Sequence, residues 1–368
     1  MKKTKNKNII ISGGGTGGHV FPAISIANAI KQIEPNSNIL FVGALGKIEM
    51  DKVPAAGYQI KGLPVAGLQR RITFKNIVFI FKLIKSLRLS KKIIKDFQPD
   101  VVVGVGGYAS GPVLYMANRK NIPTLVQEQN SYAGITNKLL AKKAQKICVA
   151  YEGMEKYFPE EKIILTGNPI RQDLLGQMDS KTEAAEYFKM DKDKRTVLVI
   201  GGSLGARTIN QSIMANMNKI GQSDVQLLWQ TGKYYYEDAK AVAEKSGYEN
   251  IKVLDFIVRM DYAYSLADMI ISRAGAGTIS ELELVGKPVV LVPSPNVAED
   301  HQTKNALALV NKNAAIMVKD SNAKIELVDR VLNLAHDKDK MIDLSRNIKG
   351  MALRDSAKII AEEVLKLG

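Results

Sequence analysis

The sequence predicts an α/β protein built from two doubly wound domains, each on a parallel sheet. An apolar run at residues 9–11 enters a loop with five glycines, and a second run at 196–200 enters another glycine loop. Between and after these runs, short apolar segments alternate with helical patterns, which is typical of a parallel sheet covered on both faces. A chain of 368 residues has the length of two domains.

The strands are predicted in chain order from short apolar runs. In the first half they occupy residues 9–11, 38–42, 101–103, 124–126 and 147–150. In the second half they occupy residues 196–200, 225–229, 251–254, 269–271 and 289–292, and a helical pattern fills the chain from about residue 323. Ligands of such sheets bind at the carboxyl ends of the strands, so the loops at 104–112, 128–130 and 272–281 are the places to look.

Composition narrows the class of protein. A single cysteine, Cys148, excludes a disulfide framework and fits a reducing compartment. The apolar run near the basic N-terminus is too short for a signal peptide, and no apolar stretch is long enough to span a membrane. We therefore expect a cytoplasmic protein. A net charge of +15 suggests an acidic partner, but few aromatic residues and no RNA-recognition motif argue against nucleic acid.

The first glycine loop predicts a cradle for phosphate or another polar ligand, because a helix begins directly after it. His19 lies where loop becomes helix, and an imidazole there can accept a proton from a hydroxyl. The alternative is a histidine that only caps the helix. Gly13, Gly15 and Gly18 also satisfy a dinucleotide-binding pattern, but no carboxylate ends the second strand before Glu49, which disfavours a nicotinamide cofactor.

Two further motifs predict chemistry in the second half. Ser203 stands among glycines at a helix start, which is typical of a diphosphate site. Glu281 either caps the helix that begins after Gly277 or accepts hydrogen bonds from a ribose, and its spacing leaves both open. The acidic stretches at 191–193 and 337–339 are embedded in lysines and are interpreted as solvated surface, so no metal site is predicted.

The segment at 70–97 carries nine basic residues and one acid, Asp96. On a helix, Ile80, Leu83, Ile84, Leu87 and Ile94 share a face with core spacing. A second apolar face is rimmed by cations, as in helices that lie in an anionic membrane surface. That face comprises Phe74, Val78, Phe81, Lys85, Arg88 and Lys92. The alternative is a core helix with an ordinary solvated basic face.

Six motifs occur in the order seen in the MurG family of peptidoglycan N-acetylglucosaminyltransferases, which the chain resembles over nearly its whole length. They are Gly14 to Ala23, Gly106-Gly107-Tyr108, Glu128-Gln129-Asn130, Gly167 to Arg171, Gly202 to Ala206 and Arg273 to Glu281. The resemblance implies a GT-B fold, in which two Rossmann-like domains face each other across a cleft. It implies an N-terminal domain of residues 1–166, joined by a helix at 345–368, and a C-terminal domain of residues 167–344.

The resemblance also implies a reaction. N-acetylglucosamine passes with inversion from UDP-GlcNAc to a polyprenyl-diphosphate-linked muramoyl-peptide at the cytoplasmic face of the membrane, where the protein is peripheral, without a metal or another cofactor. Among the matching positions, His19 is the candidate base with Glu128 in reserve, and Gly106, Gly107 and Tyr108 lie on the acceptor side. The donor contacts fall on Thr16, Gly17, Gly18, Asn130, Arg171, Ser203, Ile257, Ala276, Gly277, Thr278, Ile279, Ser280, Glu281 and Gln302.

One departure and three alternatives remain. Some family members have two glutamines where this chain has His301-Gln302, so the role of His301 is open. A glycosyltransferase that moves galactose from UDP-galactose to diacylglycerol shares the same loops and the same membrane face. A UDP-sugar epimerase shares the fold, and a membrane-surface scaffold would bind the nucleotide without turnover.

Overall fold

The computed structural model describes residues 6–65, 74–170, 180–202 and 204–368, without the side chains of 74–78 and 298. It divides into two compact units. The first unit is Met1–Ile170 with Leu353–Gly368, and the second is Arg171–Ala352. The boundaries expected from the resemblance are 166/167 and 344/345, and the two compact units divide at 170/171 and 352/353.

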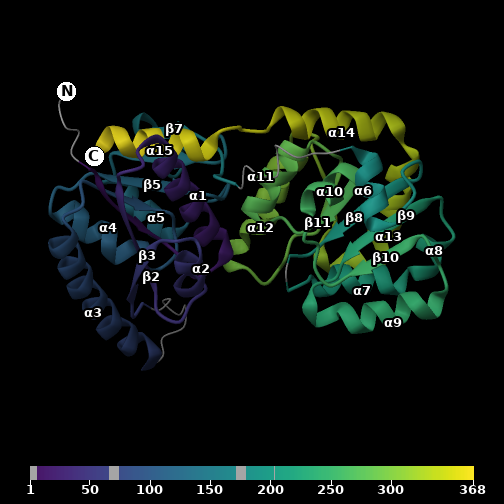
Figure 1. Cartoon of the computed structure of the whole chain (residues 1–368), viewed down its shortest axis with the longest axis horizontal. Helices are drawn as coiled ribbons and strands as arrows, with labels where there is room; N and C mark the ends of the chain where they lie inside the picture. The colour runs from purple at the N-terminus through teal and green to yellow at the C-terminus, as the bar shows by residue number, and fades with distance from the viewer. Residues whose placement is uncertain (1–5, 66–73, 171–179, 203) are drawn as a thin grey trace. The chain divides into compact units, whose positions relative to one another are not determined.

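The first unit is a seven-stranded sheet in which every strand pair is parallel, in the order β3-β2-β1-β4-β5-β6-β7. Figure 1 labels the helices α1 to α5 and α15 of this unit. Its strands are β1 (Asn8–Ser12), β2 (Asn38–Ala44), β3 (Gln59–Leu63), β4 (Val101–Gly104), β5 (Thr124–Glu128), β6 (Lys146–Val149) and β7 (Ile163–Leu165). Its helices are α1 (Gly17–Ile33), α2 (Glu49–Ala55), α3 (Phe74–Phe97), α4 (Ser110–Arg119), α5 (Ile135–Ala141), the short η1 (Glu160–Lys162) and α15 (Ser356–Leu367). One apolar cluster joins the sheet to α3, α4 and α5, and another joins it to α1, α2 and α15.

The second unit is a six-stranded parallel sheet in the order β10-β9-β8-β11-β12-β13. Its strands are β8 (Arg195–Ile200), β9 (Val225–Gln230), β10 (Ile251–Leu254), β11 (Met269–Ser272), β12 (Val289–Leu291) and β13 (Ile316–Met317). Its α-helices are α6 (Lys181–Phe188), α7 (Arg207–Ala215), α8 (Met217–Gly221), α9 (Tyr236–Ser246), α10 (Met260–Leu266), α11 (Ala276–Val285), α12 (His301–Val310), α13 (Ala323–His336) and α14 (Lys338–Gly350). Its short 3₁₀ turns among the described residues are η3 (Lys233–Tyr235), η4 (Ala298–Asp300) and η5 (Asp320–Asn322). The predicted fold class, two doubly wound parallel sheets, is confirmed.

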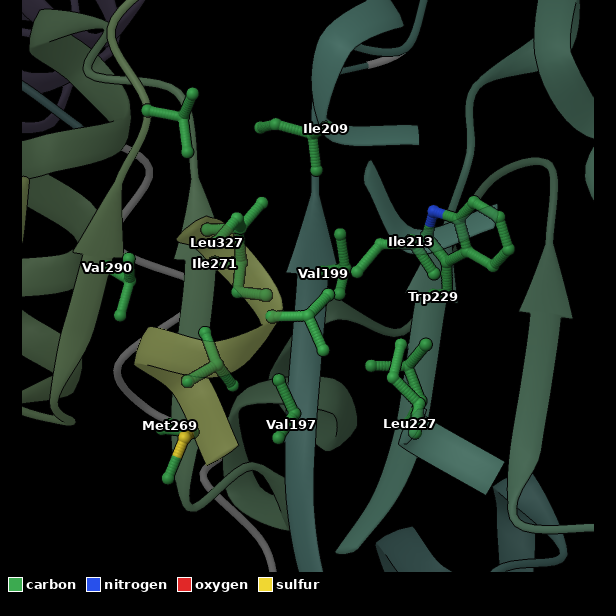
Figure 2. Packing of buried hydrophobic residues seen from close by; sticks show 14 of the residues in the cluster. Val197, Val199, Ile209, Ile213, Leu227, Trp229, Met269, Ile271, Val290 and Leu327 are labelled. Carbon is green, nitrogen blue, oxygen red and sulfur yellow. The ribbon is translucent and has the colours of Figure 1, made fainter. Parts of the chain in front are cut away.

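The core of the second unit lies between its sheet and the helices α7 and α13. Side chains from alternate positions of β8, β9 and β11 point to this face, including Val199, Trp229 and Ile271 (Figure 2). Trp229 is fully buried, and its indole nitrogen donates to Asn210 on α7 at 3.0 Å. The polar end of the largest core side chain is therefore satisfied, and α7 is fixed against the sheet.

In each sheet the strand order reverses direction once, between β1 and β4 and between β8 and β11. The loops after these strands leave toward opposite faces, which opens a crevice at the carboxyl edge. The three glycine loops predicted from the sequence follow β1, β8 and β11, and the loop at 104–108 follows β4. We call each place where the strand order reverses a switch point. Sequence and topology therefore place all four loops at the two switch points.

The C-terminal helical segment is two helices rather than one. α14 packs against α11 in the second unit, and α15 packs against α1 in the first. The chain passes between them at residues 351–355, where Asp355 has a left-handed backbone. The predicted crossing helix at 345–368 is thus confined to α15, because α14 buries Leu344 and Ile348 against its own unit.

The predicted core face of α3 is wrong in its N-terminal half. Ile80 and Ile84 are exposed, and the positions buried against the unit are Ser86, Ser90 and Ile93, together with Ile94. Among the described side chains of α3, those that are buried begin at Ser86, so spacing alone could not place the buried face. The exposed apolar surface of α3 is consequently larger than predicted.

Glu283 gives the second unit a pH-dependent stability. It lies on α11, is 8% exposed, and burial raises its pKa from 4.5 to about 8, against the opposing charge of Lys312. Between these two values the folded chain holds a proton that the unfolded chain has lost, so the free energy of unfolding falls as pH rises from about 4.5 to about 8.

We expect Glu283→Gln to remove this slope, so that its melting temperature rises relative to the parent as pH goes from 5 to 8. Thermal unfolding at several pH values measures the difference. Glu186→Gln, at an exposed position of α6, is the control that should follow the parent. Parallel curves for the parent and Glu283→Gln would contradict the assignment.

Candidate functional site

A cavity of about 770 Å³ opens in the second unit at the carboxyl ends of its strands. The loops after β8, β10, β11 and β12 line it, together with the start of α7. It therefore lies at the switch point between β8 and β11, where doubly wound sheets bind their ligands. Its wall includes Gly201, Gly202 and Gly205 of the predicted diphosphate loop. Ser203, the predicted diphosphate contact, lies outside the described residues.

Close backbone approach fixes the loop after β8. A side chain on Gly205 would lie 2.1 Å from the carbonyl oxygen of Thr231, and one on Gly232 would lie 2.1 Å from the nitrogen of Gly205. Both glycines also have positive φ angles, of 83° and 79°. Glycine is thus required at these two positions, and the loop amides are held at the start of α7.

Glu281 lies on α11 and lines the cavity, as the ribose hypothesis requires. The hydroxyl of the buried Tyr264 lies 3.3 Å from its carboxylate. Burial, then the neighbouring carboxylate, raises the pKa of Tyr264 well above its usual value, so the phenol stays protonated. Tyr264 is therefore a donor that orients Glu281, a contact that sequence spacing did not reveal.

Two glutamine side chains brace the cavity wall. Gln302 accepts hydrogen bonds from the backbone of Ala274 and Ser294 at 3.3 and 2.9 Å, which leaves its amide NH₂ for a ligand. Gln230 accepts from the nitrogen of Ile257 at 2.9 Å. The N–H of Ile257, an expected contact of the donor substrate, is thus used within the protein, so its carbonyl is the backbone group left for a ligand.

Of the other donor contacts expected in the second unit, some line the cavity and others are buried. Thr278 lines the cavity, whereas Ile279 and Ser280 are buried within α11. Ala276 and Gly277 form the first turn of α11. His301 begins α12 and is not among the residues that line the cavity.

Asp320 is a cavity residue that the sequence did not single out. Its carboxylate accepts from Arg273 at 2.5 Å and from the hydroxyl of Thr208 at 2.9 Å. Arg273 also donates to the backbone oxygens of Val292 and Pro293. These contacts tie the loops after β11 and β12 to α7, so the polar floor of the cavity is preorganised. No pattern joins positions 208, 273 and 320 in the sequence.

In the first unit, the loops after β1 and β4 interlock. A side chain on Gly107 would lie 2.2 Å from the oxygen of Gly14, and the nitrogen of Gly14 donates to the oxygen of Gly106 at 3.3 Å. Tyr108, which follows, is 59% exposed. The structure thus brings together the first motif and the Gly106-Gly107-Tyr108 motif at the other switch point.

His19 lies on the first turn of α1 beside Gly106. Its Nδ1 is 3.3 Å from the hydroxyl of Thr16, and a side chain on Gly106 would lie 2.9 Å from its Nε2. If Nδ1 carries the proton and donates to Thr16, Nε2 is left with a lone pair. This tautomer presents a base at the edge of the first unit's switch point, next to Gly17 and Gly18.

Glu128 is 2% exposed and its carboxylate is fully engaged. One oxygen accepts from the backbone and side chain of Asn130, and the other accepts from Gly134 and Asn137. Burial raises the pKa of Glu128, and these four hydrogen bonds oppose that shift. The geometry favours a positioning role, in which Glu128 orders the loop that carries Asn130, over the reserve role of a base.

The helix α3 presents apolar side chains to the outside. Phe81 is 68% exposed, with Ile80 and Ile84 beside it, and Lys85, Arg88 and Lys92 are exposed on the same helix. Phe74 and Val78 belong to the predicted face, but their side chains lie outside the described residues, as does Arg171. On α5, Ile135 and Leu139 are also exposed one helical turn apart. No helix among the described residues is long and apolar enough to cross a membrane.

Comparison with known proteins decides the family. The N-terminal domain model of glycosyltransferase family 28 matches residues 9–149, and its C-terminal domain model matches residues 196–360. The chain belongs to glycosyltransferase family 28. The first match covers β1 to β6, the second covers β8 to β13, and each includes the loops at its switch point.

Relatives of this family 28 chain match it along its whole length. A protein of Parabacteroides distasonis, named UDP-N-acetylglucosamine--N-acetylmuramyl-(pentapeptide) pyrophosphoryl-undecaprenol N-acetylglucosamine transferase, is 60% identical over 98% of both chains. The crystal structure of Acinetobacter baumannii MurG is 27% identical, with a TM-score of 0.82 over 98% of this chain and 99% of that one. A UDP-GlcNAc 2-epimerase from Neisseria meningitidis shares the fold, with a TM-score of 0.65 and 15% identity over 98% of this chain and 100% of that one.

We predict that Gly106→Ala lowers sugar transfer at least tenfold. The new methyl group would meet the imidazole of His19, at a backbone φ of 89° that costs roughly 1–2 kcal/mol for a side chain. Initial rates with saturating substrates measure the effect.

Gly153→Ala is the matched control, because Gly153 has a φ of 75° and open space around it. Both variants carry backbone strain, so both should lose stability, but only Gly106→Ala should lose activity. Equal rates for the two variants would argue against the placement of His19.

Proposed function

We propose that this chain transfers N-acetylglucosamine from UDP-GlcNAc to the muramoyl sugar of a polyprenyl-diphosphate-linked muramoyl-peptide. The observation that carries the proposal is the cavity of the second unit, which combines glycine-loop amides with Glu281 at the switch point of its sheet. Full-length identity of 60% to a transferase named for this reaction supports the donor and the acceptor.

The cavity offers a partner for each part of the donor. The glycine loop that precedes α7, with Gly201 and Gly202 in the cavity wall, suits the diphosphate, because helix N-termini attract anions. Glu281, oriented by Tyr264, suits two ribose hydroxyls, and the carbonyl of Ile257 suits the uracil. The free NH₂ of Gln302, with Thr278, suits the sugar hydroxyls.

The reaction is a displacement at the anomeric carbon. The acceptor hydroxyl attacks, the bond to the diphosphate oxygen breaks, and UDP leaves with the electron pair. Negative charge grows on the leaving diphosphate, and each preorganised donor there is worth roughly 3 kcal/mol. We propose that the loop amides, with Ser203 and Arg171, supply these donors and that no metal is needed.

The attacking hydroxyl must lose its proton. We propose that Nε2 of His19 accepts it, with Thr16 holding the tautomer, which contributes about 10² to 10⁴ in rate. Gly106 and Gly107 have no side chain beside the imidazole, so a sugar hydroxyl has room to approach it. Asn130, ordered by Glu128, is placed on the loop after β5 in the same unit and supplies a polar contact.

The acceptor carries a lipid, and we propose that α3 meets the membrane that holds it. Exposed Phe81, Ile80 and Ile84 supply apolar contact, and Lys85 and Arg88 supply attraction to anionic lipids, about 1 kcal/mol for each cation near the surface. The chain is then peripheral at the cytoplasmic face, where UDP-GlcNAc is available.

Transfer of labelled N-acetylglucosamine from UDP-GlcNAc to a lipid-diphosphoryl muramoyl-peptide, in detergent with EDTA, tests the reaction. We expect product with EDTA present, and a rate at least 100-fold lower for His19→Ala, with UDP-GlcNAc affinity unchanged. Transfer to diacylglycerol instead, or release of epimerised sugar without acceptor, would replace the proposal with one of the alternatives. Unchanged turnover in His19→Ala would remove His19 from the mechanism.

We predict that Phe81→Glu weakens binding to vesicles containing phosphatidylglycerol at least tenfold. The substitution removes an apolar contact worth about 2 kcal/mol and adds a like charge at the membrane surface. Co-sedimentation measures it. Ile325→Glu, at a site 79% exposed on α13 of the second unit, is the matched control. Equal losses in the two variants would contradict the assignment of α3.

A further inference from the structure

We propose that Glu49 is a positioning residue for the first glycine loop and keeps phosphate out of its turn. Its carboxylate is an internal anion, held where the loop would otherwise offer an amide to a substrate. The inference rests on the proposed function, because the site that it shapes is the one that contains His19. It also divides the predicted cradle into a structural part at 13–15 and a ligand-facing part at 16–18.

Glu49 is the first residue of α2 and is 1% exposed. One carboxylate oxygen accepts from the nitrogen of Gly15 at 2.9 Å. The other accepts from the nitrogen of Ala44, at the end of β2, also at 2.9 Å. The carboxylate thus bridges the loop after β1 and the end of the neighbouring strand.

Glycines on both sides make room for this carboxylate. A side chain on Gly14 would lie 2.1 Å from a carboxylate oxygen of Glu49, and one on Gly43 would lie 2.5 Å from its Cγ. The space that glycines in such loops usually leave for a ligand is therefore filled by the protein. A phosphate cannot enter the turn at 13–15 unless Glu49 leaves it.

The other amides of this turn are also engaged. Gly13 donates to the oxygen of Val42, and Gly14 donates to the oxygen of Gly106, each at 3.3 Å. The N–H groups of residues 13–15 are therefore all used within the protein, and the part of the expected cradle that is left for a ligand is the start of α1. The amides of Gly17 and Gly18 begin α1 and have no partner within the helix, so they remain for a ligand.

The negative charge of Glu49 is balanced by amide dipoles. No Lys or Arg nitrogen lies within 4 Å of it among the residues that the structure describes. The two N–H donors and the start of α2 stabilise it instead. Removing the carboxylate leaves the buried N–H of Ala44 and the part-buried N–H of Gly15 without this acceptor, so the loop that leads into Thr16 and His19 loses its anchor.

Hydrogen exchange and kinetics together test the proposal. In Glu49→Ala, we expect the amides of Gly15 and Ala44 to exchange at least tenfold faster. In Glu49→Gln, the side chain keeps its shape but turns an NH₂ toward one of the two N–H groups. We expect its kcat for transfer to fall at least tenfold, with KM for UDP-GlcNAc within twofold of the parent.

Rescue separates positioning from general loss of stability. Formate fits the space that Glu49→Ala leaves and can accept from both amides, so 100 mM formate should restore part of kcat, whereas chloride should not. Asp51→Asn, exposed on the same helix, is the control and should match the parent. Parental kcat in Glu49→Gln with unchanged exchange in Glu49→Ala would overturn the proposal, as would a loss confined to UDP-GlcNAc affinity.

The exchange measurement needs no substrate. If the parent chain does not transfer N-acetylglucosamine, the proposed function fails. Faster exchange at Gly15 in Glu49→Ala would still support the role of Glu49 as a positioning residue. If the parent is active and the exchange at Gly15 does not change in Glu49→Ala, the positioning role of Glu49 is wrong and the proposed function stands.

Discussion

Backbone packed directly against backbone is the constraint on which both sites depend. In the first unit, the turn at Gly14 and the turn at Gly107 leave no room for a Cβ atom, and in the second unit Gly205 and Gly232 do the same. Such contacts need glycine with a positive φ on at least one side. In exchange, they hold two loops from different strands in one fixed arrangement, without flexible side chains between them.

The two units use this shared architecture differently. In the second unit, the glycine loop at 201–205 borders a cavity of about 770 Å³, and polar side chains converge on it. In the first unit, the turn at 13–15 is filled by Glu49, and the polar groups that face outward are Thr16 and His19. One unit is therefore suited to holding an anionic nucleotide, and the other to presenting a base beside a helix start.

Positions that are near in sequence were predictable, and contacts between distant positions were not. The strands, the glycine loops and the placement of Glu281 in a cavity follow from local pattern, because strand ends and helix starts in a parallel sheet share one edge. Glu49 lies 34 residues from Gly15, and Asp320 lies 47 residues from Arg273, so no spacing rule connects them. The buried face of α3 was mispredicted because, among its described side chains, those that are buried begin only at Ser86, which spacing does not show.

We assign the nucleotide of the donor to the cavity of the second unit, and the acceptor hydroxyl to His19 of the first unit. Calorimetric titration of UDP into the full chain tests this assignment most directly, with Glu281→Ala and Glu49→Gln compared side by side. We expect one site per chain, at least tenfold weaker binding in Glu281→Ala and unchanged binding in Glu49→Gln. Undiminished binding in Glu281→Ala, or loss of binding in Glu49→Gln, would contradict the assignment.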